Sequence, residues 1–254
     1  MINEGYDHVI ATADKKMKFY INCKTSYFMS SILAGLFVGI CIVTSLIMAG
    51  MLNDFAGLKI IQGASFAAAL SLVVFAGAEL FTGNVFVMTA GYMKKKIRLP
   101  DAMQFLTHCY LGNLLGSIII AGLFGGTGYL QDKVLIETVY AIYSKTNPTF
   151  VQLFIRGVLC NILVCAAVWC MYRMKSESAK LIMIFWCIYM FVVCGFEHSI
   201  ANMTLFSLGL MASADDMASF GLIVMNLTAT TLGNILGGIM LSLSYWAVAR
   251  KTVE

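Results

Sequence analysis

Two short stretches decide how this chain folds: Gly77-Ala-Glu-Leu-Phe-Thr-Gly-Asn84 and Gly195-Phe-Glu-His-Ser-Ile-Ala-Asn202. Both fit the pattern G-x-E-x-x-x-x-N. Each lies near the middle of an apolar run of 34 residues (60–93 and 181–214) in which its glutamate is the only charged residue. A straight helix of that length would extend about 51 Å, well beyond a hydrocarbon core of about 30 Å. We therefore predict that both runs are helices interrupted near the glutamate.

The composition is that of an integral membrane protein. Of the 254 residues, 60% are hydrophobic and 12% are charged, whereas soluble domains carry roughly 25% charged residues. Besides the two long runs, four more have at most one charged residue and the length to span a bilayer: residues 27–52, 102–131, 150–172 and 217–249. We predict an all-α membrane protein with six transmembrane helices. The short alternating strands of a membrane barrel do not occur in the sequence.

An internal repeat relates the two halves of the chain. The stretch Leu111-Gly-Asn-Leu-Leu-Gly116 matches Leu232-Gly-Asn-Ile-Leu-Gly237 at an offset of 121 positions, close to the 118 that separate the two glutamates. Two matches in the same order indicate a duplication of three spans, and an odd number of spans inverts the second copy. Interrupted helices at corresponding points of inverted repeats indicate a permeation site near the membrane midplane.

This repeat divides the chain into four predicted parts. They are an N-terminal cytoplasmic segment (1–26), two three-span repeats (27–131 and 132–249) and a cytoplasmic tail (250–254).

Basic residues predict the orientation in the membrane. Thirteen of the seventeen Lys and Arg residues lie in the N-terminal segment, the connections after the second and fourth spans, and the tail. Cytoplasmic segments carry an excess of Lys and Arg, so we expect both termini in the cytoplasm and the protein in the cell's inner membrane. We read these residues as orientation signals beside anionic lipid headgroups, and we expect no nucleic-acid partner.

Polar residues inside the spans have structural interpretations. Broken helices expose backbone N–H and C=O groups that must be satisfied at membrane depth. We interpret Glu79 and Glu197 as side chains that cap those N–H groups and stabilise the loops, and Asn84 and Asn202 as amides that fix the same loops. The alternative is that the two glutamates bind the permeant.

No residue pattern indicates an enzyme. The eight cysteines contain no C-x-x-C pair, so we expect no metal site and read them as small apolar side chains. A haem site would need paired axial histidines, and the spans hold only His108 and His198. An intramembrane protease would need a nucleophile with a base, or two aspartates. We therefore predict no catalytic residue and no cofactor.

Three stretches, in order, resemble signature motifs of the formate/nitrite transporter family. They are residues 78–84 (Ala-Glu-Leu-Phe-Thr-Gly-Asn), residues 156–165 (Arg-Gly-Val-Leu-Cys-Asn-Ile-Leu-Val-Cys) and residues 196–203 (Phe-Glu-His-Ser-Ile-Ala-Asn-Met). The form of the first motif is most similar to the hydrosulfide-channel branch. The resemblance implies an aquaporin-like fold, a homopentamer in the lipid bilayer, and a pore in each protomer. It also implies passage of small monovalent weak-acid anions, with hydrosulfide favoured and formate or nitrite possible.

The resemblance also implies roles for individual residues. Thr82, Asn161 and His198 would meet at the pore centre. Leu80 and Phe191 would form a cytoplasmic constriction, and Phe66 and Leu70 the opposite one, with Phe66, Leu70 and Phe191 placed by spacing only. Lys16 and Lys145 would be the vestibule lysines, with Lys15 and Lys18 as neighbours that compete with Lys16. Arg156 would take a structural or lipid-facing role.

A mechanism follows from these implied roles. A bare anion pays a large desolvation penalty in a dry constriction, so the pore would reject anions of strong acids. A weak-acid anion can take up a proton and cross as the neutral acid, because loss of water raises its proton affinity. His198 would donate or relay the proton, or would only hydrogen-bond the permeant together with Thr82; the sequence leaves both open.

Two other kinds of transport protein are alternatives. An aquaporin needs two Asn-Pro-Ala motifs, and this chain has only Pro100 and Pro148, both outside the spans. The alternative that stays open is a proton-coupled secondary transporter of formate- or nitrite-type anions, in which Glu79, Glu197 and His198 would form a proton relay.

Overall fold

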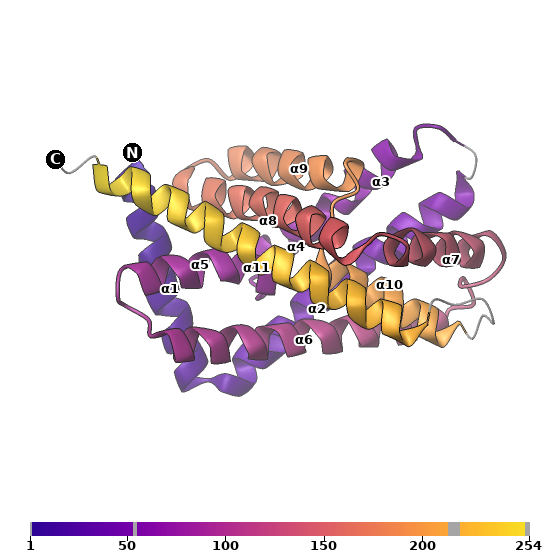
Figure 1. The fold of residues 1–254 in the computed structure, drawn as a ribbon, viewed down its shortest axis with the longest axis horizontal. Helices are drawn as coiled ribbons and strands as arrows, with labels where there is room; N and C mark the ends of the chain where they lie inside the picture. Colours follow the sequence, from indigo (N-terminus) through magenta and orange to yellow (C-terminus); the bar gives the residue numbers. More distant parts are fainter. Residues whose placement is uncertain (1, 53–54, 213–218, 252–254) are drawn as a thin grey trace.

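The computed structural model describes residues 2–52, 55–212 and 219–251, and this part of the chain is helical with no strand. The helices in chain order are α1 (Ile2–Asn22), α2 (Lys24–Met51), α3 (Leu58–Phe66), α4 (Ala68–Phe75), α5 (Phe81–Met93), α6 (Leu99–Gly125), α7 (Asp132–Thr146), α8 (Phe150–Arg173), α9 (Glu177–Val193), α10 (Ser199–Met211) and α11 (Phe220–Lys251). Helices α6, α8, α9 and α11 run along the long axis of the molecule, and α1 lies across one end (Figure 1). The all-α prediction is confirmed for the described residues.

Five stretches of the described chain are long and apolar enough to cross a membrane: Lys24–Met51, Leu58–Phe75, Leu99–Gly125, Phe150–Arg173 and Phe220–Ala249. Four of them are single helices, whereas Leu58–Phe75 is divided at Ala67 into α3 and α4. The two prolines of the chain lie at or before the starts of helices. Pro100 occupies the first turn of α6, where its missing N–H costs nothing, and Pro148 precedes the Thr149 cap of α8. The predicted span at residues 181–214 is divided into α9, with 17 residues, and α10, with 13.

Both long apolar runs break beside their glutamates. The chain leaves α4 at Phe75 and starts α5 at Phe81, and it leaves α9 at Val193 and starts α10 at Ser199. Gly77 and Gly195 have φ values of +75° and +68°, a region that glycine adopts without steric cost. Helices α5 and α10 start near the middle of the molecule and run toward opposite ends (Figure 1).

A buried asparagine of α6 holds the first break. The Asn113 side chain is fully buried. Its Nδ2 donates to the carbonyl oxygens of Ser31 (2.7 Å) and Glu79 (2.9 Å), and its Oδ1 accepts the N–H of Phe81 (2.9 Å). The bonds to Glu79 and Phe81 satisfy groups that the helix interruption leaves exposed, as is required at membrane depth, and the bond to Ser31 ties the break to α2.

Asn234 of α11 does the same at the second break. Its Nδ2 donates to the carbonyl oxygens of Gly157 (2.8 Å) and Glu197 (2.9 Å), and its Oδ1 accepts the N–H of Ser199 (2.9 Å). The two asparagines therefore make the same three kinds of bond, each linking a break to two long helices.

Close helix pairs support these asparagines. A Cβ placed on Gly116 of α6 would lie 2.1 Å from the carbonyl oxygen of Ile32 in α2, and one on Gly233 of α11 would lie 2.2 Å from that of Phe154 in α8. Glycine lets the backbones of these helices approach closely, and a larger residue at either position would force them apart.

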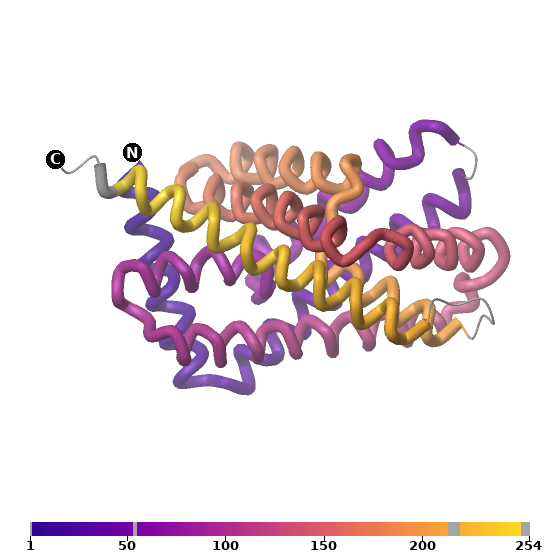
Figure 2. The backbone as a smooth tube through the Cα atoms, in the orientation of Figure 1, coloured from indigo at the N-terminus to yellow at the C-terminus, as the bar shows by residue number. Residues whose placement is uncertain are grey.

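The N-terminal segment is itself part of the packed structure. Tyr6, Val9, Ala13, Met17 and Tyr20 form the buried stripe of α1, with the spacing of an amphipathic helix. This stripe packs against α5 and α8. The tube in Figure 2 shows that α1 begins at the end of the molecule where the last turns of α11 lie.

Candidate functional site

The first turns of α5 and α10 meet near the middle of the molecule. Thr82 Oγ1 lies 3.0 Å from His198 Nε2, and both side chains are buried. His198 precedes α10, and its Nδ1 accepts the backbone N–H of Ala201 (3.2 Å). A ring nitrogen that accepts a hydrogen bond carries no proton. The ring is therefore the neutral tautomer, with its N–H at Nε2 donating to Thr82.

Asn161 of α8 lies beside this pair. Its fully buried side chain donates from Nδ2 to the carbonyl oxygens of Thr82 (3.2 Å) and Asn234. Its Oδ1 has no hydrogen-bond partner among the described residues. The structure thus brings together Thr82, Asn161 and His198, the three residues predicted for the pore centre. Two helix N-termini, each carrying partial positive charge, converge on the same point.

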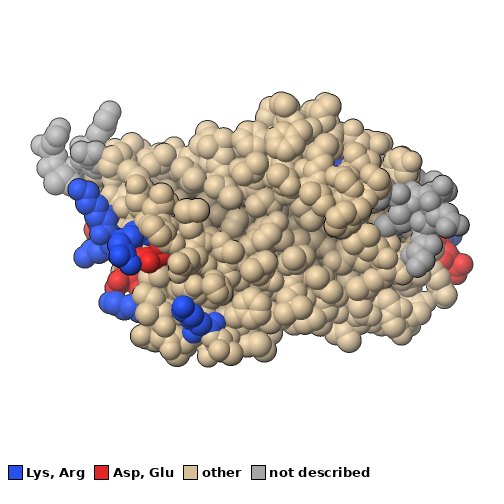
Figure 3. Space-filling model, turned by 60° about the horizontal axis from the view of Figure 1, so that its bottom comes forward, with Lys and Arg blue, Asp and Glu red and all other residues tan. Residues whose placement is uncertain are grey.

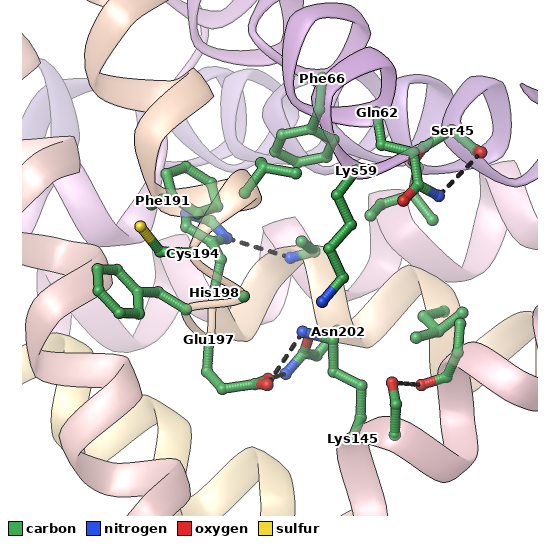
Figure 4. Close-up of a pocket in the computed structure, with 18 of the residues that line it drawn as sticks. Ser45, Lys59, Gln62, Phe66, Lys145, Phe191, Cys194, Glu197, His198 and Asn202 are labelled. Atoms are coloured by element: carbon green, nitrogen blue, oxygen red, sulfur yellow. Dashed lines mark hydrogen bonds and ion pairs between the residues drawn. The ribbon is translucent and has the colours of Figure 1, made fainter. Parts of the chain in front are cut away.

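Two cavities approach this point from opposite sides. The large cavity, of about 400 Å³, is lined by α2, α3, α7, α8, α9, α10 and the break at residues 194–198 (Figure 4). The small cavity, of about 150 Å³, is lined by α1, α4, α5, α8 and the break at residues 77–80. Of the three predicted pore-centre residues, only His198 lines the large cavity, and none lines the small one.

A narrow apolar gap of about 10 Å³ lies between the cavities, a volume that holds about one water at most. Phe66, Phe191 and His198 line both the gap and the large cavity, whereas Leu70 and Leu80 line both the gap and the small cavity. Every other lining residue of the gap is aliphatic: Val38, Ala69, Val164 and Ile188. Among the described residues, His198 is the only polar side chain in this lining.

The four predicted constriction residues all line the gap, but in a different pairing. The prediction joined Leu80 to Phe191 and Phe66 to Leu70. In the structure the Phe66 and Phe191 rings meet edge to face, with centroids 5.9 Å apart, on the large-cavity side. Leu70 and Leu80 lie on the other side. A spacing of four places Phe66 and Leu70 on one helix face but about 6 Å apart along the axis, which separates them into two levels.

An ion pair anchors each glutamate. Lys16 Nζ donates to Glu79 Oε2, which also accepts Asn84 Nδ2 (2.8 Å). Of the two neighbouring lysines, Lys18 pairs with Asp14 on the exposed face of α1, and Lys15 is exposed. Lys16 thus lines the small cavity as a paired cation.

The second glutamate has matching partners. Lys145 Nζ lies 3.0 Å from Glu197 Oε1, and Glu197 Oε2 accepts Asn202 Nδ2 (2.7 Å). Neither carboxylate caps a backbone N–H as predicted, because the two asparagines of α6 and α11 already fill that role. Each glutamate instead links its own loop to a lysine and to the first turn of the helix that follows, which is α5 for Glu79 and α10 for Glu197.

Two further basic residues line the large cavity. They are Arg156, for which a structural or lipid-facing role is predicted, and Lys59. Sequence reasoning assigned no site role to Lys59. The positions of the two residues in the sequence could have indicated a place in the cavity lining. Arg156 is the one charged residue in its apolar run, and Lys59 immediately precedes another apolar run.

Comparisons with known proteins agree on one family. A family model described as formate/nitrite transporter matches residues 3–247. The chain is 36% identical to the nitrite transporter NirC of Escherichia coli (strain K12) over 255 residues, which cover 99% of this chain and 94% of that protein.

Two solved structures are similar. An "FNT family ion channel" has a TM-score of 0.90 at 35% identity and covers 96% of this chain and 98% of its own. A "pentameric formate channel with formate bound" has a TM-score of 0.75 at 30% identity, covering 88% and 96%.

The ion pair at the second break yields a stability prediction. Glu197→Gln should lower the free energy of unfolding by about 3 kcal/mol, because it removes one partner of a largely buried pair. The side chains of Glu197 and Lys145 are 2% and 24% exposed. The matched control is Glu177→Gln, which breaks the exposed pair with Lys180 and should change stability by about 1 kcal/mol at most. Thermal unfolding in detergent measures both, and equal shifts would contradict the structural role.

Proposed function

The chain belongs to the formate/nitrite transporter family, and from this premise we propose a membrane channel for small monovalent anions of weak acids. The protein is a multi-span membrane protein of a family of transporters and channels. One observation carries the proposal. Two cavities that contain basic residues are separated by an apolar gap of about 10 Å³, and His198 is the only polar side chain that lines it.

The gap favours a neutral permeant over a charged one. An anion entering it would lose its hydration, a penalty that neutral molecules do not share. The gap is lined by a phenylalanine pair on one side and a leucine pair on the other. Among its described lining residues, only His198 can form a hydrogen bond with a permeant through its side chain. A weak-acid anion therefore takes up a proton from water in a cavity, crosses as the acid, and releases the proton on the far side.

His198 acts here as a hydrogen-bond partner and not as the proton source. Protonation of Nδ1 would break its bond to the Ala201 N–H. It would also place a cation at the N-terminus of α10, where the helix dipole disfavours positive charge. The neutral ring can exchange its bond with Thr82 for one with the passing acid.

Several weak acids fit this gap, and we propose hydrosulfide, nitrite and formate as the substrate class. The first motif favours hydrosulfide by its resemblance. The similarity to the nitrite transporter NirC favours nitrite, and the similarity to a channel with formate bound favours formate. The apolar lining with a single hydrogen-bonding ring suits any small acid that makes one such bond.

We further propose six spans arranged as two inverted repeats in a homopentamer. Support for the repeat comes from the matched bonds of Asn113 and Asn234 and the matched lysine–glutamate pairs. Support for the pentamer comes from the similar formate channel, which is pentameric. We assign both termini to the cytoplasmic side of the inner membrane. In support, Lys and Arg gather at one end of the face shown in Figure 3, and cytoplasmic segments carry an excess of these residues.

A proton-coupled secondary transporter is the alternative, with Glu79, Glu197 and His198 as its relay. Against it, both carboxylates are engaged by a lysine and an asparagine. A transporter would show acceleration by substrate on the far side, whereas a channel would not.

The neutral-acid route predicts that a proton accompanies each anion. Proteoliposomes given an inward nitrite or hydrosulfide gradient should acidify inside, without an ionophore to balance charge, and faster as the outside pH falls. A pH-sensitive dye trapped in the lumen measures this, and protein-free liposomes give the lipid background. Anion uptake that needs a compensating potassium ionophore and leaves the lumen pH unchanged would contradict the proposal.

A histidine variant tests the assigned role of the ring. His198→Asn keeps a side chain that can cap Ala201 but removes the Nε2 donor and any titration near neutral pH. We expect flux to fall about five- to tenfold, the effect of one hydrogen bond, with an unchanged shape of the pH profile. His108→Asn is the matched control, because His108 bonds Tyr20 and lines neither cavity. Loss of the pH dependence in His198→Asn would instead make His198 the proton source.

A further inference from the structure

A long apolar groove lies over α5, between α6 and α11. Its volume is about 600 Å³, larger than that of either cavity on the pathway. Helix α5 packs against both α6 and α11, and its buried side chains Phe81, Val85 and Met88 form the floor. The groove shares no described lining residue with the two cavities or with the apolar gap. The transport pathway therefore does not account for it.

The groove has the length of one membrane leaflet. Three helix stretches line it: Phe81–Met93 in α5, Leu99–Leu111 in α6 and Thr231–Leu243 in α11. Each stretch is about 18 Å long, close to half of a hydrocarbon core of about 30 Å. Its inner end, at Phe81, adjoins Thr82 of the pore centre. Its outer end lies at the connection between α5 and α6, at the end of the molecule where α11 also ends (Figure 1).

The lining offers an occupant few polar partners along this length. The hydroxyls of Thr89 and Thr107 donate to backbone carbonyl oxygens one turn earlier. Those of Tyr110 and Thr231 bond to each other (2.9 Å) and link α6 to α11 near the inner end. Apart from Tyr92, which is exposed at the outer end, the other described lining residues are apolar. Such a lining favours a hydrocarbon chain.

The groove is also too narrow for a protein helix. A volume of about 600 Å³ spread over about 18 Å corresponds to a cross-section of about 30 Å², whereas a helix with its side chains is about 10 Å across and covers about 80 Å². A helix from a second copy of the chain would therefore rest on the rim and leave the floor uncovered. An extended acyl chain is thin enough to reach the floor.

Positive charge gathers where the groove opens. The connection between the groove residues of α5 and those of α6 carries Lys94, Lys95, Lys96 and Arg98. Arg98 pairs with Asp101. The three lysines are exposed and have no ion pair with any described residue. Figure 3 shows Lys and Arg at this end of the molecule. An occupant that is apolar along its length and negatively charged at one end matches both features.

We propose that this groove binds an acyl chain of an anionic phospholipid, whose phosphate lies against Lys94, Lys95 and Lys96. Basic clusters at the cytoplasmic ends of transmembrane helices recognise anionic headgroups, and tyrosines such as Tyr92 are enriched at the same membrane interface. The acyl chain packs against the floor, so the bound lipid supports α5, the half-helix that begins at the pore centre. This site is independent of which anion the pore conducts.

Photo-crosslinking tests the site directly. The protein is reconstituted in phosphatidylcholine vesicles with a trace of a probe lipid that carries a diazirine midway along one acyl chain. The probe has either a phosphatidylglycerol or a phosphatidylcholine headgroup, and mass spectrometry maps the labelled residues. One lysine near the surface contributes about fivefold to binding of an anionic lipid. We therefore expect the phosphatidylglycerol probe to label the middle of the groove, at Met88, Met103 and Ile239, about tenfold or more above the other probe.

A lysine variant tests the headgroup contact. The triple substitution Lys94→Gln, Lys95→Gln and Lys96→Gln should lower the preference to about twofold or less, because it removes the charges that select the anionic headgroup. Labelling by the phosphatidylcholine probe should stay the same. Thermal unfolding checks that the triple variant is folded.

The matched control removes three other exposed basic residues on the side that we assign to the cytoplasm: Lys15→Gln, Arg173→Gln and Lys175→Gln. None of them lines the groove, so the preference should persist. An equal loss in both triple variants would show general attraction to a basic surface and overturn the site. Equal labelling by the two probes would overturn headgroup recognition. A groove that stays unlabelled while other lipid-facing residues react would show that a neighbouring protomer covers it, which would also overturn the proposal.

Discussion

The hydrogen bonds of two buried asparagines hold the helix breaks on which the rest of the structure depends. A broken helix at membrane depth exposes N–H and C=O groups, and each one left unpaired in a buried setting costs about 1–3 kcal/mol. Asn113 and Asn234 each satisfy two such groups and donate a third bond to a carbonyl oxygen of a neighbouring long helix. With the breaks fixed, α5 and α10 start near one point, and Thr82 and His198 meet there. The remaining features of the site follow from this meeting.

Charge and apolar surface act at separate levels of the pathway. The paired Lys16 and Lys145 hold the loops through Glu79 and Glu197. When the described linings of the two cavities are compared, cations without an ion pair occur only in that of the large cavity. The apolar gap lies beyond them. In our account, anions are first gathered by charge and then admitted according to whether they can become neutral. A strong-acid anion satisfies the first condition and fails the second.

The breaks could be predicted from the sequence pattern, and the grouping of Thr82, Asn161 and His198 was implied by the family resemblance, whereas the levels along the pathway could not be predicted. Each apolar run is too long for one straight helix and contains one glutamate with a nearby glycine, so its interruption follows from length and local chemistry. Periodicity assigns Phe66 and Leu70 to one face, but it does not say which neighbour each ring meets across the gap. Likewise, Lys59 and Arg156 are distant in sequence, and only the packing of α3 against the other helices brings them to one cavity.

Nitrite and nitrate form the pair of anions that tests the central claim most directly. They are similar in size and equal in charge, but nitrous acid is weak and nitric acid is strong. The measurement is the initial rate of uptake of each anion into proteoliposomes at several pH values, relative to protein-free liposomes. We predict that the protein accelerates nitrite uptake, increasingly so as the pH falls, and leaves nitrate at the lipid background. Equal acceleration of nitrite and nitrate would contradict this claim.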